Sequence, residues 1–143
     1  MFSLRLGCAA RYRVLEVDDN RDVADSQGLV LECLGAETRV AYDGETALGI
    51  IPEFKPHLVI MDIGMPGMDG CETARRIRQL PDGKNIIVAA LSGWGHDDIR
   101  RRTAEAGFDH HFVKPIGVTA LEKLLASCAN LRDASHHLTP QVA

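Results

Sequence analysis

The sequence contains no apolar run that approaches the length of a membrane-spanning helix, so no association with a membrane is expected. The amino-terminal stretch is short and is interrupted by Arg5, which argues against a secretion signal. Basic residues are not in excess: 16 Lys and Arg stand against 20 Asp and Glu, and the net charge of −4 argues against a nucleic-acid-binding surface.

Cysteine pairs with the spacing of a metal site or a redox motif are also lacking. The four cysteines lie at positions 8, 33, 71 and 128, and no two of them are close enough in sequence to form either kind of site. A reduced, cytoplasmic protein is therefore the expectation.

The length and composition are those of one globular domain. The chain has 143 residues, of which 45% are hydrophobic and 25% charged, and no internal repeat or low-complexity segment divides it. We expect a folded domain over residues 13–131, an amino-terminal extension over residues 1–12 and a disordered tail over residues 132–143.

Short apolar segments alternate with amphipathic segments along the chain. The predicted strands cover residues 13–17, 37–41, 57–61, 86–91 and 110–113, and the predicted helices cover residues 21–34, 44–51, 70–79, 97–106 and 118–131. Pro52 and Pro56 are expected to end the second helix, and Arg75, Arg76 and Arg78 to point largely to solvent. Five strand–helix pairs predict a parallel sheet with helices on both faces.

Polar side chains follow four of the five predicted strands. Asp18 and Asp19 come after the first strand, Asp62 after the third, Ser92 after the fourth and Lys114 after the fifth. Because parallel strands end at the same edge of a sheet, these side chains are expected to share one crevice. Any one of them alone is more simply explained as a helix cap, but four such strand ends in a small domain indicate a functional site.

The chemistry of this set favours phosphoryl transfer. Three carboxylates in one crevice repel one another, and a hard divalent cation such as Mg²⁺ relieves that repulsion with oxygen ligands. Lys114 adds a compact positive charge and Ser92 a hydroxyl donor, which suits the charge on a transferred phosphoryl group. Asp62 is then the candidate nucleophile that forms an aspartyl phosphate.

One residue does not fit the pattern of a buried strand. Glu16 interrupts the first predicted strand, where a carboxyl group without a partner is costly to bury. We therefore expect its side chain to face an opening or to pair locally.

Four motifs make the assignment specific. They are Val-Asp-Asp-Asn at 17–20, Met-Asp-Ile-Gly-Met-Pro-Gly-Met-Asp-Gly at 61–70, Leu-Ser-Gly at 91–93 and Phe-Val-Lys-Pro at 112–115. Together they resemble the receiver domain of bacterial two-component response regulators, of the chemotaxis type or from hybrid histidine kinases, over residues 13–131. The resemblance implies a flavodoxin-like α/β fold, with a doubly wound five-stranded parallel sheet in strand order 2-1-3-4-5.

The resemblance also implies roles for individual residues. The matched positions hold or accept the phosphoryl group: Asp62 as phosphoacceptor; Asp18, Asp19, Asp62 and the backbone carbonyl of Gly64 as the Mg²⁺ site; Ser92 as the hydroxyl that swings onto the phosphoryl group; and Lys114 as its pairing cation. The Lys114–Pro115 peptide bond is expected to be cis.

The sequence departs from the family at the position of the switch residue. The family often has Tyr or Phe three residues before the lysine, where this chain has His111. An imidazole can still move with Ser92, but its polar edge can add pH dependence. Gly64 and Trp94 match positions that tune the lifetime of the phosphate: Gly64 leaves the path of an attacking water open, whereas Trp94 can shield it.

A phosphorelay switch follows from the resemblance. The expected partners are a histidine kinase or a histidine phosphotransfer protein and an unidentified downstream protein, with the domain acting as a monomer or weak dimer and catalysing only its own phosphorylation and dephosphorylation. A phosphorylation-independent interaction module with the same fold remains an alternative. A Mg²⁺-dependent phosphatase needs a second carboxylate where this chain has Gly64, and a flavin-binding protein needs phosphate-cradling hydroxyls where it has Asp18 and Asp19.

Overall fold

The structure is a computed structural model that describes residues 12–65, 67–93 and 97–128. Along the chain, strands alternate with helices in the order β1 (Arg13–Val17), α2 (Arg21–Cys33), β2 (Glu37–Ala41), α3 (Gly44–Phe54), β3 (Leu58–Asp62), α4 (Gly70–Gln79), the 3-10 helix η1 (Gly83–Asn85), β4 (Ile87–Ser92), α5 (Asp97–Ala106) and β5 (His110–Val113). A further helix covers residues 118–128 and is called helix 118–128. The predicted alternation is confirmed.

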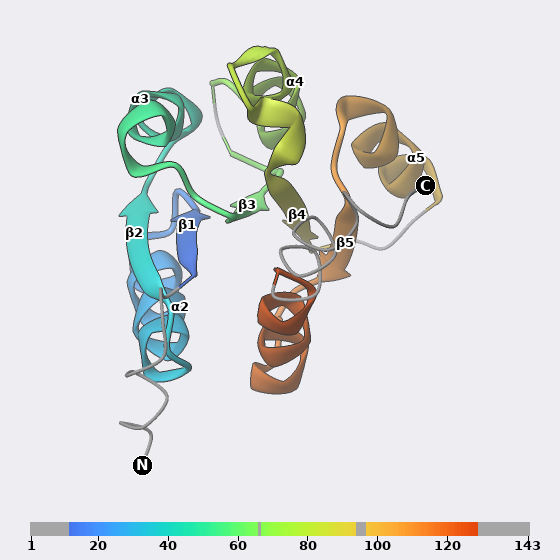
Figure 1. Cartoon of the computed structure of the whole chain (residues 1–143). Helices are drawn as coiled ribbons and strands as arrows, with labels where there is room; N and C mark the ends of the chain where they lie inside the picture. The colour runs from blue at the N-terminus through green and yellow to red at the C-terminus, as the bar shows by residue number, and fades with distance from the viewer. Residues whose placement is uncertain (1–11, 66, 94–96, 129–143) are drawn as a thin grey trace, which may run out of the picture.

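The five strands form one parallel sheet in the order β2-β1-β3-β4-β5, which confirms the predicted flavodoxin-like topology. Helices α3, α4 and α5 lie on one side of the sheet, and α2 and helix 118–128 lie on the other (Figure 1). Every residue of β3 and β4 is buried, because these central strands are covered on both faces.

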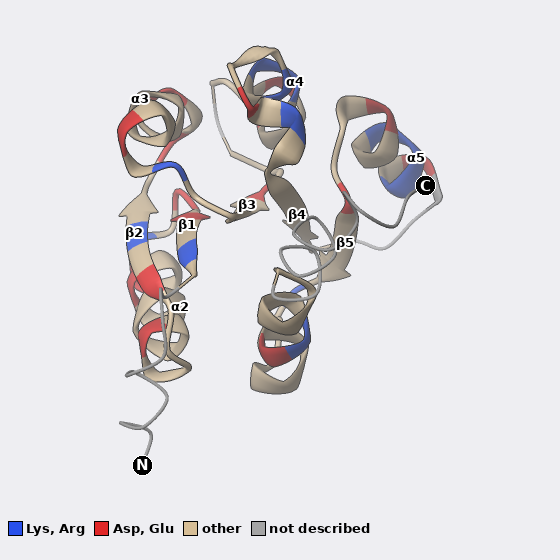
Figure 2. Cartoon of the chain, in the orientation of Figure 1, with Lys and Arg blue, Asp and Glu red and all other residues tan. Residues whose placement is uncertain are grey.

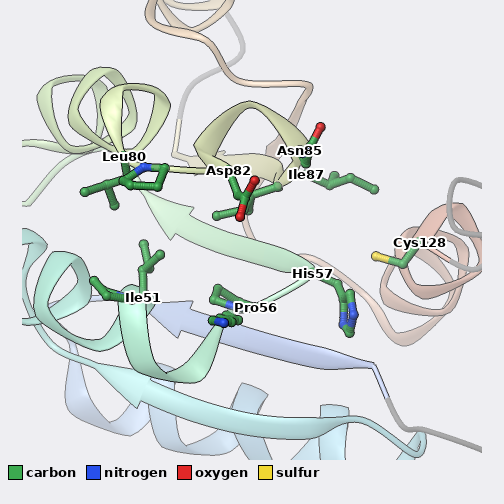
Figure 3. A pocket seen from close by; sticks show the side chains of 12 residues that line it. Ile51, Pro56, His57, Leu80, Asp82, Asn85, Ile87 and Cys128 are labelled. Carbon is green, nitrogen blue, oxygen red and sulfur yellow. The ribbon is translucent and has the colours of Figure 1, made fainter. Parts of the chain in front are cut away.

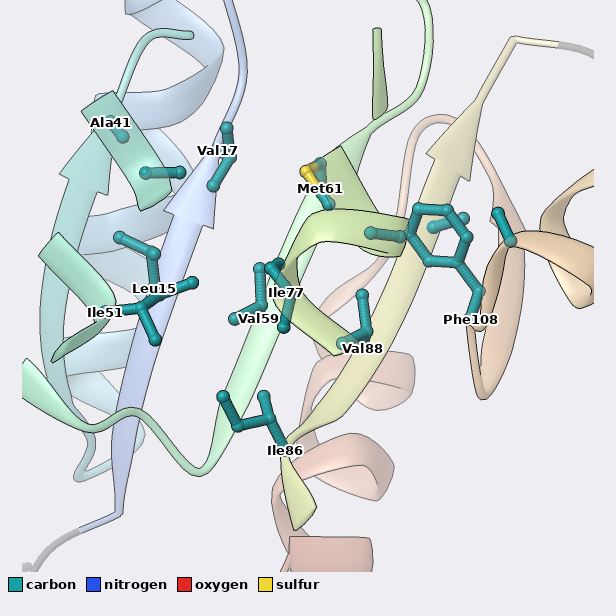
Figure 4. Packing of buried hydrophobic residues seen from close by; sticks show 14 of the residues in the cluster. Leu15, Val17, Ala41, Ile51, Val59, Met61, Ile77, Ile86, Val88 and Phe108 are labelled. Carbon is teal, nitrogen blue, oxygen red and sulfur yellow. The ribbon is translucent and has the colours of Figure 1, made fainter. Parts of the chain in front are cut away.

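Two apolar layers separate the sheet from its helices. On the side of α3, α4 and α5, residues such as Val59 and Val88 pack with Ile51, Ile77 and Phe108 (Figure 4). On the other side, a second set of alternate strand residues packs against α2 and helix 118–128 through Leu31, Leu121, Leu124 and Cys128, among others. Alternate strand residues therefore belong to opposite layers, which fixes the side of the sheet that each polar residue near a strand end faces.

The helices begin where the sequence supplies capping side chains. Asn20, Asp43 and Asp69 precede α2, α3 and α4, and each side chain accepts a hydrogen bond from a backbone N–H in the first turn. These caps start each helix immediately after the preceding strand or loop, which keeps the carboxyl edge of the sheet open.

Two expectations about side chains and helix ends are wrong. Helix α3 does not end at Pro52 but continues to Phe54, and Lys55 closes it in the left-handed conformation. Proline in the last turn removes only one helical hydrogen bond, and burial of Phe54 favours the extra turn. Arg78 does not point to solvent: its guanidinium group donates to the carbonyl oxygens of Gly83, Ile86 and Gly107.

Other predictions concern residues that the structure does not describe. Outside the described residues lie residues 1–11 of the predicted extension over residues 1–12, residues 129–131 of the last predicted helix, the predicted tail over residues 132–143, and Trp94. Within the described residues, no helix has both the length and the apolar character required to cross a bilayer.

Candidate functional site

The predicted site residues lie at the carboxyl edge of the sheet. Asp18 directly follows β1, Asp62 is the last residue of β3, Ser92 is the last residue of β4, and Lys114 directly follows β5. Figure 2 shows acidic residues where β1 and β3 end. Asp18, Asp62 and Lys114 meet at this edge although they are far apart in sequence, as expected for parallel strands. Ser92 is placed at the same edge by its position at the end of β4.

Three carboxylates form the centre of the site. One oxygen from each of Asp18, Asp19 and Asp62 lies within 4.8 Å of the other two. Asp18 is 0% exposed and Asp62 is 8% exposed, whereas Asp19 lies at the surface. The cluster therefore has two buried members and one member that faces solvent, so it is open to a ligand on one side.

Lys114 joins two of these carboxylates. Its Nζ lies 3.0 Å from Asp18 Oδ2 and 3.5 Å from Asp62 Oδ2. Burial alone would lower the pKa of Lys114, but the hydrogen bond to Asp18 and the charges of Asp62 and Asp18 outweigh it and raise the pKa. Lys114 is therefore a firmly charged ammonium group between the two buried acids.

The environment of Asp62 balances opposing effects. Its Oδ1 accepts a hydrogen bond from the backbone N–H of Gly64 at 3.1 Å. Burial raises the pKa of Asp62; the Gly64 hydrogen bond and the Lys114 charge oppose this rise, and the neighbouring charges of Asp18 and Asp19 add to it. The net effect is a raised pKa of Asp62, so additional positive charge nearby would favour its ionised form.

The donor set fits a hard divalent cation. Three carboxylates share one lysine, which leaves about two negative charges uncompensated within a single cluster. Carboxylate oxygens at this spacing are the ligands that Mg²⁺ prefers, and the exposed Asp19 leaves room for the waters that Mg²⁺ retains. Asp18, Asp19 and Asp62 are thus brought together as expected; the role of the Gly64 carbonyl stays a prediction.

Ser92 at the end of β4 and His111 on β5 form a pair. Ser92 is 4% exposed, and its Oγ lies 2.7 Å from His111 Nε2. Burial lowers the pKa of His111, and the positive charge of Arg100 lowers it further. The ring is therefore neutral at neutral pH.

The comparison with family models decides which family this site belongs to. Residues 14–126 match the model of the response regulator receiver domain. The chain belongs to the response regulator receiver domain family. Receiver domains are signalling switches rather than metabolic enzymes. They generally bind Mg²⁺ at an acidic pocket, and the cluster of Asp18, Asp19 and Asp62 agrees with that property of the family.

Two relatives of different lengths match this receiver domain. It is 33% identical over 116 residues to the "Uncharacterized 14.6 kDa protein in sodA1 3'region" of Leptolyngbya boryana, covering 81% of this chain and 88% of that protein. It is 37% identical over 116 residues to the response regulator MprA of Mycolicibacterium vanbaalenii, covering 80% of this chain but only 47% of MprA. The chain therefore spans about half the length of MprA.

Solved structures agree with the fold. The chemotaxis protein CheY4 of Vibrio cholerae matches with a TM-score of 0.79 at 26% identity, covering 83% of this chain and 99% of that chain. The receiver domain of Ssk1 from Saccharomyces cerevisiae, in a co-crystal structure with the histidine phosphotransfer protein Ypd1, matches with a TM-score of 0.78 at 24% identity, covering 85% of this chain and 91% of that chain. At 24% identity, the second match concerns the fold alone.

The cis peptide bond expected in this receiver domain is present between Lys114 and Pro115. It follows β5 directly, at the point where the chain carries the Lys114 side chain toward Asp18 and Asp62. The implied geometry of this loop is thus confirmed.

The expectation for Glu16 is wrong. The side chain is 0% exposed, and neither carboxylate oxygen has a hydrogen-bond partner in the part of the chain that the structure describes. Burial raises the pKa of Glu16 well above its ordinary value; the charge of Asp18 adds to the rise, that of Lys114 opposes it and that of Asp62 adds to it. Glu16 therefore stays protonated to a higher pH than an ordinary glutamate, because an unpaired buried carboxylate is costly.

A separate apolar cavity lies at the opposite edge of the sheet. It has a volume of about 520 Å³, and its walls include Ile51, Pro56, Leu80 and Ile87 (Figure 3). His57 at its side accepts a hydrogen bond from the backbone N–H of Arg13. Because Pro56 and His57 precede β3 and Ile87 begins β4, the cavity lies at the amino ends of these strands and is not part of the acidic site.

Proposed function

We propose that this receiver domain accepts a phosphoryl group on Asp62 from a phosphohistidine donor and thereby switches the binding of a downstream protein. The observation that carries the proposal is the cluster of Asp18, Asp19 and Asp62, with Lys114 within 3.5 Å of Asp62 and 3.0 Å of Asp18. Three neighbouring carboxylates repel one another, so the cluster is costly without a cationic ligand. The anionic phosphoryl group can approach Asp62 only when the negative charge of the cluster is balanced.

Asp62 supplies the nucleophile in this proposal. A carboxylate oxygen forms the new bond to phosphorus while the P–N bond of the donor breaks, and the leaving imidazole keeps the electron pair and takes up a proton. The Gly64 N–H and the Lys114 ammonium oppose the raised pKa of Asp62, which favours the ionised form that attacks.

The other residues act on charge. Asp18, Asp19 and Asp62 would hold Mg²⁺, which, when bound, supplies positive charge to the oxygens of the transferred group. Lys114 already lies beside Asp62 and pairs with the phosphoryl oxygens once the group is attached. Ser92 supplies a hydroxyl group that donates a hydrogen bond to the phosphoryl group. In this structure the Ser92 hydroxyl is hydrogen-bonded to His111.

A histidine kinase or a histidine phosphotransfer protein is the donor that we propose. A fold relative, the receiver domain of Ssk1, has been crystallised with such a phosphotransfer protein. We further propose a cytoplasmic protein that is a monomer or weak dimer and that catalyses only its own phosphorylation and dephosphorylation. No nucleic acid is proposed to bind this domain, whose net charge is −4.

Incubation with phosphoramidate and Mg²⁺, followed by intact mass measurement, tests the proposal. We expect a gain equal to one phosphoryl group, lost on treatment with hydroxylamine, because an acyl phosphate reacts with that nucleophile. Asp62→Asn should abolish the gain, since an amide oxygen is a poor nucleophile.

Asp69→Asn is the matched control for this experiment. Asp69 lies seven residues further on and caps α4, a role that asparagine fills equally well, so this variant should be phosphorylated like the wild type. Lack of phosphorylation of the wild-type chain, with a partner still bound in its absence, would favour the phosphorylation-independent module instead.

A further inference from the structure

The hydrogen bond between Ser92 and His111 connects the ends of two neighbouring strands. In the β4–β5 register, His111 lies opposite Ala90, and Ser92 lies two residues further along β4. The imidazole thus leans toward the carboxyl edge, where its Nε2 lies 2.7 Å from Ser92 Oγ. A diagonal pair of this kind is within reach of a long or aromatic side chain in a sheet.

Ser92 and Asp62 face opposite sides of the sheet. Ser92 shares its side with Ala90, which packs in the layer under α3, α4 and α5. Asp62 shares its side with Ile60, which packs in the layer of α2 and helix 118–128. Because side chains alternate along a strand, the Ser92 hydroxyl has to turn away from His111 before it can meet a group on Asp62.

The unpartnered ring nitrogen of His111 indicates its tautomer. His111 Nδ1 is buried and has no hydrogen-bond partner among the described residues. If Nδ1 carried the proton, the structure would contain a buried orphan N–H, which is rarer and costlier than a buried orphan acceptor. The proton therefore sits on Nε2, and the ring donates to Ser92 Oγ.

The charge near the ring keeps His111 neutral in this arrangement. Among the described residues, Arg100 on α5 is the charged group that acts on His111, while β4 contributes only the uncharged Ala90 and Ser92 to its surroundings. A second proton on the ring would be placed on the buried Nδ1 in the field of Arg100. Burial and that field lower the pKa of His111, so protonation opposes the inward position of the ring.

We propose that neutral His111 holds Ser92 away from Asp62, so that a phosphoryl group on Asp62 gains the serine hydroxyl only by breaking the Ser92–His111 hydrogen bond. This proposal rests on the proposed function of Asp62. It makes His111 a positioning residue that sets how readily the acidic site responds. Acid favours the response, because a ring that has left the site regains an ordinary pKa and takes up the proton that the inward ring resists.

The bond itself is tested on the unphosphorylated protein by NMR of its histidine side chains. We expect His111 to carry its proton on Nε2 and to titrate below the ordinary histidine pKa. Arg100→Gln should raise its titration midpoint, whereas Arg101→Gln should not, because Arg101 is 67% exposed and pairs with Asp98. A His111 ring that titrates normally, or that carries its proton on Nδ1, would overturn the proposal.

The effect on the site is tested with beryllium fluoride and Mg²⁺, a mimic of the phosphoryl group. His111→Phe removes the donor to Ser92 and should tighten the apparent affinity roughly three- to tenfold at neutral pH, the value of one net hydrogen bond. His111→Gln keeps an N–H donor and should stay near the wild type. In wild type the affinity should rise on acidification relative to His111→Phe.

The Ser92→Ala background shows whether the gain passes through the serine. In that background, His111→Phe should have no effect on the affinity, and an equal gain with or without Ser92 would overturn the proposal. An unchanged or weakened affinity of His111→Phe would do the same. If no variant binds beryllium fluoride while the NMR result holds, the proposed function of Asp62 fails, and the hydrogen bond cannot serve it.

Discussion

At the scale of single residues, the carboxyl edge of the sheet contains acids in opposite circumstances. Asp18 and Asp62 share the Lys114 ammonium, whereas Glu16, on β1, is buried without a hydrogen-bond partner among the described residues. A paired buried acid contributes charge to the site, but an unpaired one only reduces stability. Asp18 and Glu16, which lie two residues apart, therefore have different effects: Asp18 contributes charge to the site, whereas Glu16 lowers the stability of the fold.

Replacement of Glu16 by valine, which has a similar volume, should raise the free energy of unfolding by about 1–3 kcal/mol at neutral pH. The folded pKa of Glu16 is raised, so its unfavourable contribution is absent below the unfolded pKa and grows as pH rises through that value toward the folded pKa. The gain should therefore shrink on acidification. Urea denaturation in EDTA at several pH values measures it.

The matched control for Glu16 lies on the exposed side of the fold. Glu37 at the start of β2 is an exposed glutamate, and Glu37→Val should change stability little, with no dependence on pH of this kind. A loss of stability for Glu16→Val at every pH would show that the Glu16 carboxyl group has a partner in solution.

At the scale of elements, Arg78 on α4 joins the segments that precede β4 and β5. Its guanidinium nitrogens donate to Gly83 and Ile86, before β4, and to Gly107, before β5. The Arg78 side chain is 18% exposed, so these carbonyl groups have little access to water as an alternative donor. Helix α4 thereby positions the starts of both strands that end in Ser92 and Lys114.

Arg78→Ala should lower the free energy of unfolding by about 2–4 kcal/mol, because three partly buried carbonyl groups lose their donor. Arg78→Lys should recover little, since one ammonium group cannot reproduce the planar fork. Arg76→Ala on the same helix is the control: Arg76 is 53% exposed and pairs with Glu72, so its loss should cost about 0.5 kcal/mol. Equal losses for the two alanine variants would contradict this account.

At the scale of the whole molecule, the acidic cluster couples the stability of the fold to its ligand. Asp18 and Asp19 follow β1 and Asp62 ends β3, so a cation that holds all three also ties β1 to β3. Binding to the folded state alone adds stability by mass action.

Mg²⁺ should therefore raise the free energy of unfolding of the wild type, by about 1.4 kcal/mol at ten times the dissociation constant. Asp19→Asn should remove most of this gain, because it removes a ligand that is open to solvent. Asp98→Asn should retain it, since Asp98 is 87% exposed and lies on α5. Thermal unfolding with Mg²⁺, and with NaCl at equal ionic strength, measures the difference; an equal gain with NaCl would rule out the site.

The sequence by itself determined the order of the elements and the composition of the acidic site. Apolar segments ending in Asp62, Ser92 and Lys114 specify buried parallel strands, and parallel strands deliver their ends to one edge whatever the details of packing. Lys114 and Asp18 thus meet although 96 residues separate them. The strand order and the cis bond between Lys114 and Pro115 were predicted from the resemblance of the four motifs to the receiver family, and both are confirmed.

Only the tertiary structure decided which partner each polar group has. Three features depend on how helices and strands that are distant in sequence pack together. They are the inward turn of Arg78, the burial of Glu16 without a partner among the described residues, and the hydrogen bond between His111 and Ser92. Local patterns record which residue types an element prefers, but a side-chain partner is set by the distance and direction between elements, which no local pattern contains.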